Sequence, residues 1–287
     1  MRARLLFIAG FLLSLVAPAW AEPLAIVTAE NVYGDVAAQI GGPDVTVLSI
    51  LSSPDQDPHL FEANASVARQ VSAARIVILN GAGYDPWMNR LLRASPASSR
   101  TVIEISALLQ RKAGDNPHLW YEPAAMPALA KALTDALAAH DPAHEAQYRA
   151  RLAAFVASFE PLAEKIASLR KAHAGKAITA TEPIFGYMAE ALGLKMRNER
   201  FQLAVMNGTE PRASDIAAFQ KDLKARAVKA LIYNEQTSQS LTERMKTQAR
   251  DAGVAVIGVW EMAPQNGRYQ DWMLTQLQSL ESALASP

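Results

Sequence analysis

The chain contains no cysteine, and this absence excludes several classes of site at once. A disulfide framework, a thiolate zinc site, an iron–sulfur cluster and a cysteine nucleophile all need the missing sulfur atom. Histidine is also scarce, with five residues among 287. Any metal site must therefore use a few imidazoles, carboxylates and water.

The sequence also lacks an excess of charge of either sign. Lys and Arg total 28, as do Asp and Glu. Because binding to a phosphate backbone depends on clustered positive charge, we expect no nucleic-acid partner. The composition, 50% hydrophobic and 20% charged, is typical of a folded globular protein, and the length allows two lobes.

The long apolar run at the amino terminus, Leu5 to Val16, is shorter than the roughly 20 residues that a membrane-spanning helix needs. Two arginines precede this run, and Ala19-Trp20-Ala21 follows with the small-x-small form of a cleavage site. We therefore predict a cleaved signal peptide over residues 1–21 and a periplasmic protein that begins at Glu22. An uncleaved anchor is the alternative.

Short apolar runs alternate with amphipathic helical stretches over an N-terminal lobe, residues 22–140. This alternation is typical of the α/β class. The expected strands are 24–27, 45–51, 75–80 and 101–104, and the expected helices are 32–40, 65–74 and 85–93.

A linking segment, residues 141–174, follows this lobe. Apolar residues recur there at spacings that alternate between four and three: Tyr148, Leu152, Phe155, Phe159, Leu162, Ile166 and Leu169. The pattern predicts one long amphipathic helix, in which Pro161 could cause a kink or a break into two helices. A coiled-coil dimer is the alternative, but fewer than four heptads are present, so we expect a monomer.

The alternation resumes in a C-terminal lobe, residues 175–287. Its expected strands are 177–181, 228–233 and 254–260, and its expected helices are 184–192, 213–225, 237–252 and 269–285. The predicted fold is therefore α/β, with two lobes of mainly parallel sheet joined by a long rigid helix. Because open parallel sheets bind ligands beyond the carboxyl ends of their strands, we expect the site in the cleft between the lobes.

Two of the five histidines share a loop motif in which proline fixes the backbone just before the imidazole. These are His59, in Asp57-Pro58-His59, and His118, in Asn116-Pro117-His118. Either motif alone could be a capped turn, but two in one lobe favour a divalent transition metal. The remaining histidines, His140, His144 and His173, are expected to be solvated.

Two glutamates follow predicted strands of the second lobe, where a ligand in the cleft would lie. Glu182 precedes Pro183, which should hold it extended, and Glu261 follows strand 254–260. Each could instead complement the dipole of a helix.

The motifs resemble those of the metal-binding solute-binding proteins of ABC importers, cluster A-I. The likeness rests on Asp57-Pro58-His59, on Asn116-Pro117-His118-Leu119-Trp120 and on Thr181-Glu182. The resemblance implies metal ligands at His59, His118, Glu182 and Glu261, with Mn²⁺ or Zn²⁺, or Fe²⁺, as cargo. It also implies partners in the inner membrane, an ABC permease and its ATPase.

The sequence departs from the family in two ways. The fourth ligand is usually Asp, which leaves Glu235 as a substitute candidate for Glu261, and no His-rich loop lies between His59 and His118. We place Glu62, Trp120 and Tyr187 around the ligands, although Trp120 could simply pack in the core.

Manganese is slightly favoured as the cargo because the expected ligands include two carboxylates, although Zn²⁺ outcompetes Mn²⁺ in most nitrogen and oxygen sites. The same ligands could serve a metallohydrolase. No His-Glu-x-x-His helix and no Gly-x-Ser-x-Gly elbow is present, so we expect no enzyme. A chelate-binding protein on the same scaffold is a further alternative, which would need aromatic or Arg side chains lining the cleft.

Overall fold

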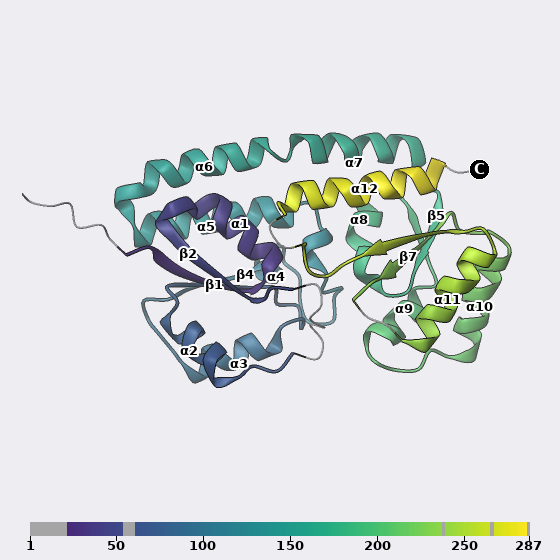
Figure 1. Cartoon of the computed structure of the whole chain (residues 1–287), viewed down its shortest axis with the longest axis horizontal. Coiled ribbons are helices and arrows are strands. Elements are labelled where there is room, and N and C mark those ends of the chain that lie inside the picture. Colours follow the sequence, from purple (N-terminus) through teal and green to yellow (C-terminus); the bar gives the residue numbers. More distant parts are fainter. Residues whose placement is uncertain (1–21, 54–60, 237–238, 265–266, 286–287) are drawn as a thin grey trace, which may run out of the picture.

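The computed structural model describes residues 22–53, 61–236, 239–264 and 267–285 (Figure 1). It contains two four-stranded sheets in which every neighbouring pair of strands is parallel. The strand orders, β2-β1-β3-β4 and β6-β5-β7-β8, follow the same pattern in the two sheets. The predicted fold, two α/β lobes of parallel sheet, is confirmed.

The first lobe carries the first sheet and the helices that flank it. Its strands are β1 (Leu24–Glu30), β2 (Val45–Leu51), β3 (Ile76–Leu79) and β4 (Thr101–Glu104). Its helices are α1 (Asn31–Gly41), α2 (Ala65–Ala73), α3 (Pro86–Ala94), α4 (Ile105–Leu108) and α5 (Ala125–His140). Of these, α4 and α5 were not predicted from the sequence pattern.

The second lobe repeats this arrangement. Its strands are β5 (Ala177–Ala180), β6 (Lys195–Arg197), β7 (Ala230–Asn234) and β8 (Ala255–Val259). Its helices are α8 (Gly186–Ala191), α9 (Glu199–Met206), α10 (Ala213–Lys224), α11 (Ser240–Asp251) and α12 (Tyr269–Ala285). Neither β6 nor α9 was predicted. The strand β6 is a short edge strand, and it has no apolar run that would indicate it.

The linking segment is two consecutive helices, α6 (Glu145–Ala157) and α7 (Glu160–His173), which run along both lobes (Figure 1). Pro161 lies in the first turn of α7. Proline is tolerated in a first turn, but inside one continuous helix it would remove a backbone hydrogen bond and its ring would clash with the carbonyl four residues before it. The break is the second of the two outcomes that Pro161 allowed, and a single unbroken helix is not observed.

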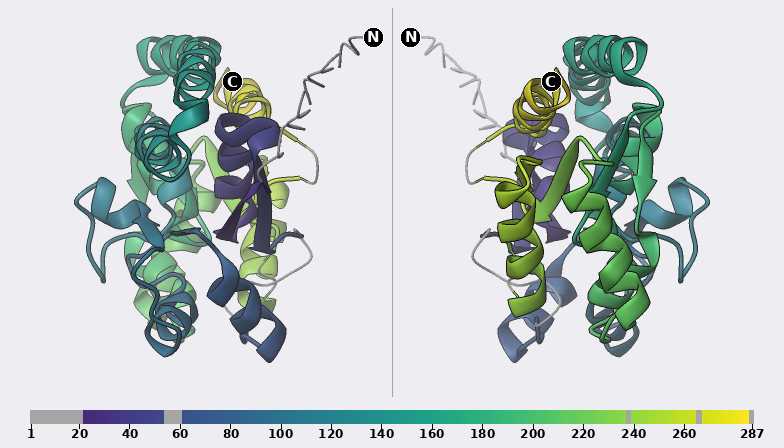
Figure 2. Two further views of the ribbon diagram at one scale, coloured as in Figure 1. Left: turned by 90° about the vertical axis from the view of Figure 1, so that its left-hand side faces the viewer. Right: turned by 90° about the vertical axis from the view of Figure 1, so that its right-hand side faces the viewer.

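The apolar stripe of this segment packs inside its own chain. Tyr148, Phe155, Leu162 and Leu169 are buried in a core cluster that includes residues of both sheets. Helix α12 lies beside α7, as Figure 2 shows, and also contacts α1 of the first lobe. The stripe is therefore covered by the protein's own core. A coiled-coil dimer would instead have required a second chain to cover it.

No helix in the portions of the chain that the structure covers is both long and apolar enough to span a membrane. The predicted signal peptide, residues 1–21, lies outside the described residues.

We expect Leu169→Ala to destabilise the protein by about 2–5 kcal/mol, because it removes a side chain that is 1% exposed and leaves a cavity between α7 and the core. Val156→Ala, on a side chain that is 51% exposed in α6, is the control and should change stability little. Chemical denaturation of the two variants is the measurement. Equal losses of stability in the two variants would show that the Val156 side chain also packs against another part of the protein.

Candidate metal centre

Three of the predicted ligands lie together at the boundary between the lobes. His118, Glu182 and Glu261 each offer a potential ligand atom, and these atoms lie within 4.8 Å of one another. All three side chains are buried, at 0%, 2% and 0% exposure. We call these three residues the metal group.

Sheet topology explains why the two glutamates meet. Glu182 follows β5 and Glu261 follows β8, and both strands run parallel to β7, which lies between them. The carboxyl ends of parallel strands share one edge of the sheet. Glu182 is extended (φ −143°, ψ 162°) before Pro183, as the sequence predicted.

The histidine comes from the other lobe, where its loop is fixed by hydrogen bonds. Asn116 Oδ1 accepts the backbone N–H of His118 at 3.2 Å and lies 2.7 Å from His118 Nδ1. With the ring proton on Nδ1, the neutral imidazole keeps Nε2 unprotonated, which is the form that binds a metal. Asn80 also holds this loop, because its side-chain amide donates to Pro117 O at 2.9 Å.

Asn116 ties the two lobes together at the same point. Its side-chain N–H donates to Pro183 O at 2.7 Å, directly after Glu182, while its own carbonyl accepts the hydroxyl of Tyr187 at 2.8 Å. A single amide therefore positions His118 from one lobe against Glu182 from the other.

Neutral donors hold the two carboxylates. Asn234 Nδ2 donates to Glu261 Oε1 at 2.6 Å and to Glu182 Oε2 at 3.2 Å. Tyr84 of the first lobe donates its hydroxyl to Glu261 Oε2. Gln236 Oε1 accepts the backbone N–H of Glu261 and of Met262, at 2.6 and 2.7 Å. Glu261 is thus fixed from both lobes.

The surroundings of the metal group disfavour negative charge. Burial raises the pKa of Tyr84 well above its usual range, and the charges of Glu261 and Glu30 raise it further. Asp85, the next residue, has a pKa raised to about 6 by burial, although the N–H groups of Gly81 and Asn80 partly oppose the rise. A cation bound between the carboxylates would offset this electrostatic cost.

The other predicted residues lie as follows. His59 is in the segment 54–60, outside the described residues. Glu235 is not in the metal group. It forms an ion pair with Lys246 at 3.5 Å and is one-third exposed. Glu62 is exposed, so its predicted contact with a ligand loop stays a prediction.

Of the aromatic residues that the sequence placed around the ligands, Trp120 lies beside His118. The Trp120 ring is fully buried and lies edge-on to His118, with 5.4 Å between centroids, so it supports the imidazole by packing. The three histidines expected to be solvated, His140, His144 and His173, are partly exposed and stand outside the metal group.

Sequence reasoning missed the functions of Tyr84 and Asn234. Asn234 ends β7, but only the strand order places it between Glu182 and Glu261. Tyr84 follows Gly81 and Gly83, whose positive φ angles of 75° and 90° favour glycine. The two glycines indicate a tight loop, yet nothing in them indicates that the next residue reaches the opposite lobe.

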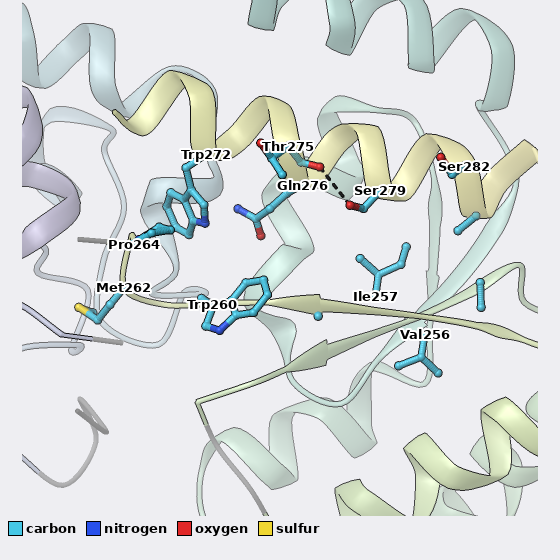
Figure 3. A pocket seen from close by; sticks show the side chains of 13 residues that line it. Val256, Ile257, Trp260, Met262, Pro264, Trp272, Thr275, Gln276, Ser279 and Ser282 are labelled. Carbon is cyan, nitrogen blue, oxygen red and sulfur yellow. Dashed lines mark hydrogen bonds between the residues drawn. The ribbon is translucent and has the colours of Figure 1, made fainter. Parts of the chain in front are cut away.

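A separate cavity of about 710 Å³ lies between β8 and α12 (Figure 3). Trp260 and Trp272 stand on its two walls, and Gln276 extends into it from α12. None of the metal group lines it, although Trp260 and Met262 flank Glu261 in the chain. The two tryptophans of this cavity are therefore apart from the metal group.

This chain is similar over most of its length to known metal-binding proteins. A putative metal-binding protein of Treponema pallidum is 23% identical over 272 residues, which is 88% of this chain and 84% of the relative. The structure is similar to the periplasmic zinc-binding protein TroA of T. pallidum, with a TM-score of 0.78 and 18% identity over 92% of this chain and all of that one. It is also similar to the solute-binding protein FpvC of Pseudomonas aeruginosa in complex with Mn²⁺, with a TM-score of 0.75 and 22% identity over 92% and 98% of the chains.

The family model of the periplasmic zinc-uptake complex component A, ZnuA, matches residues 26–283, which is nearly the whole described chain. The matched region contains the segments that carry the resemblance seen in the sequence, with His118 and Glu182 among their residues, and it also contains Glu261. The chain belongs to this family of periplasmic metal-binding components of metal-uptake systems.

Proposed function

We propose that this protein captures one divalent transition metal ion at His118, Glu182 and Glu261, with His59 as a fourth ligand, and delivers it to an ABC permease. The observation that carries the proposal is the buried metal group, in which a histidine of one lobe meets two glutamates of the other within 4.8 Å. Nothing in this function requires a chemical step, so the protein acts as a binding component and not as an enzyme.

The charges of the group support a divalent ion. Two ionised glutamates carry two negative charges, and a neutral imidazole adds none, so a divalent cation makes the set neutral. An isolated ion would be very costly to bury, but this neutral set with hydrogen bonds from Asn234 and Tyr84 is not.

Manganese is the cargo that we favour over zinc, by a small margin. Carboxylate oxygens suit Mn²⁺ better than a site rich in imidazole does. The FpvC structure holds Mn²⁺, and TroA is described as a zinc-binding protein, so similar folds serve both ions. Because Zn²⁺ binds more tightly to most such sites, protein purified with trace zinc would carry it whatever the physiological cargo.

Delivery would depend on the two lobes sharing the ion. A ligand that bridges both lobes stabilises the arrangement in which they meet. A permease that recognises this arrangement would select the loaded protein, and the linking helices α6 and α7 would limit how far the lobes separate.

The first test is metal binding itself. The purified protein should bind one Mn²⁺ or Zn²⁺ per chain and melt at a higher temperature with it, because a ligand that binds only the folded state shifts unfolding by mass action. Calorimetric titration and thermal melts measure both effects. His118→Ala and His59→Ala should weaken binding strongly, and the control His140→Ala should not. Absence of binding by the unaltered protein would reject the proposed function.

A second test concerns the assignment of Glu261 as a ligand. Glu261→Gln keeps the shape and removes one charge, so we expect metal affinity to fall at least about tenfold, roughly 1.4 kcal/mol. Glu235→Gln is the matched control and should cost much less, because Glu235 faces Lys246. Equal losses in the two variants would show that the ligand is wrongly assigned.

A third test addresses the support of the imidazole. Asn116→Ala removes the hydrogen bonds to His118 and Pro183, so metal affinity should fall about 10–100-fold, as loss of a partner that orients a metal ligand typically does. The exposed Asn207→Ala serves as the control. Melting of the metal-free variants separates lost positioning from lost folding. Unchanged metal affinity in Asn116→Ala would mean that the His118 imidazole does not need the hydrogen bond to Asn116 in order to bind the ion.

A further inference from the structure

Glu30, the last residue of β1, is a buried carboxyl that the proposed metal group leaves unused. Its exposure is 0%, and neither of its carboxyl oxygens is hydrogen bonded to another residue. A buried polar group without such partners is costly and rare, so its presence calls for an explanation. An amide or apolar side chain of similar size would be cheaper at this position.

The groups that face Glu30 are neutral or acidic. Glu30 interacts electrostatically with Tyr33 of α1, with Tyr84 and Asp85 of the loop after β3, and with Glu261 of the segment after β8. Burial raises the pKa of Glu30 well above its usual range, and the charges of Asp85 and Glu261 raise it further. No cationic side chain in the portion of the chain that the structure covers contributes an opposing electrostatic effect on Glu30.

Glu30 is nonetheless coupled electrostatically to a member of the metal group, Glu261. Geometry places it in the same region, because the next residue, Asn31, exchanges two hydrogen bonds with the backbone of Ala263, two residues after Glu261. The ion that balances those two glutamates would therefore act on Glu30 as well.

We propose that Glu30 is a specificity-determining carboxylate of the metal centre, which offers the bound ion a further oxygen and so favours Mn²⁺ over Zn²⁺. This inference rests on the proposed function. Glu30 lies outside the group of three whose ligand atoms are within 4.8 Å, so its carboxyl turns toward the ion on binding. The terminal torsion of glutamate is soft, which makes this rotation inexpensive.

The preference follows from the coordination habits of the two ions. Zn²⁺ is satisfied by four ligands in most protein sites, whereas Mn²⁺ favours carboxylate and water oxygens in octahedral geometry. An additional carboxylate therefore benefits Mn²⁺ more.

The experiment compares Glu30→Gln with the unaltered full chain, using calorimetric titration with Mn²⁺ alone and with Zn²⁺ alone. We expect the dissociation constant for Mn²⁺ to rise about tenfold or more and that for Zn²⁺ to change less than about threefold. The metal-free variant should be at least as stable as the parent, because a buried carboxyl has been removed.

The matched control is Glu104→Gln. Glu104 ends β4 of the same sheet, as Glu30 ends β1, but its carboxylate already accepts the Ser106 hydroxyl at 2.6 Å. It should leave both affinities unchanged.

Equal losses for the two ions, or no loss in Glu30→Gln, would overturn the inference while leaving the proposed function intact. Failure of the unaltered chain to bind either ion would reject the proposed function itself. A crystal structure of the Mn²⁺-loaded protein provides a measurement that needs no variant: the inference requires a Glu30 oxygen in the coordination sphere, and its absence there contradicts it.

Discussion

The burial of negative charge between the two lobes is the constraint on which the rest of this structure depends. Glu182 and Glu261 lie almost out of contact with solvent, and Glu30 and Asp85 are buried close by. Each carboxylate would prefer water to this environment unless a cation or a hydrogen bond compensates. The amide of Asn234 and the hydroxyl of Tyr84 supply part of that compensation. A divalent ion would supply the remainder, which is the physical reason for proposing that the site binds one.

The segment after β8 connects this electrostatic centre to the whole fold. Asn31, at the start of α1, exchanges two hydrogen bonds with the backbone of Ala263, at 2.8 and 3.1 Å. Met262 is buried in the core of the first lobe, although β8 belongs to the second. Glu261 therefore lies where the chain passes from one lobe to the other, so a change in lobe arrangement would move this ligand.

How much of the site could be predicted depended on where the strands were expected to end. Glu182 and Glu261 follow the strands expected at 177–181 and 254–260, and the structure brings both side chains together with His118. Glu30 also ends a strand, but the predicted strand stopped at residue 27, because Thr28-Ala29-Glu30 does not continue the apolar run. Asn234 depended on strand order, which no local pattern contains. The parallel sheets followed from local rules, and Pro161 allowed the helix break without requiring it, whereas contacts across the lobes followed from no local pattern.

The shared core limits the way in which the ion could be released. Ile26 of the first sheet and Ile178 and Ile232 of the second belong to one hydrophobic cluster, which the helices of the linking segment also join. Separating the lobes widely would expose this apolar surface, at a cost that grows with the area uncovered. The ligands, in contrast, stand on loops at the strand ends, where a rotation of one side chain or loop breaks few apolar contacts. Release is therefore expected to begin with local movement of the ligand loops, while the helices and the common core keep the lobes together.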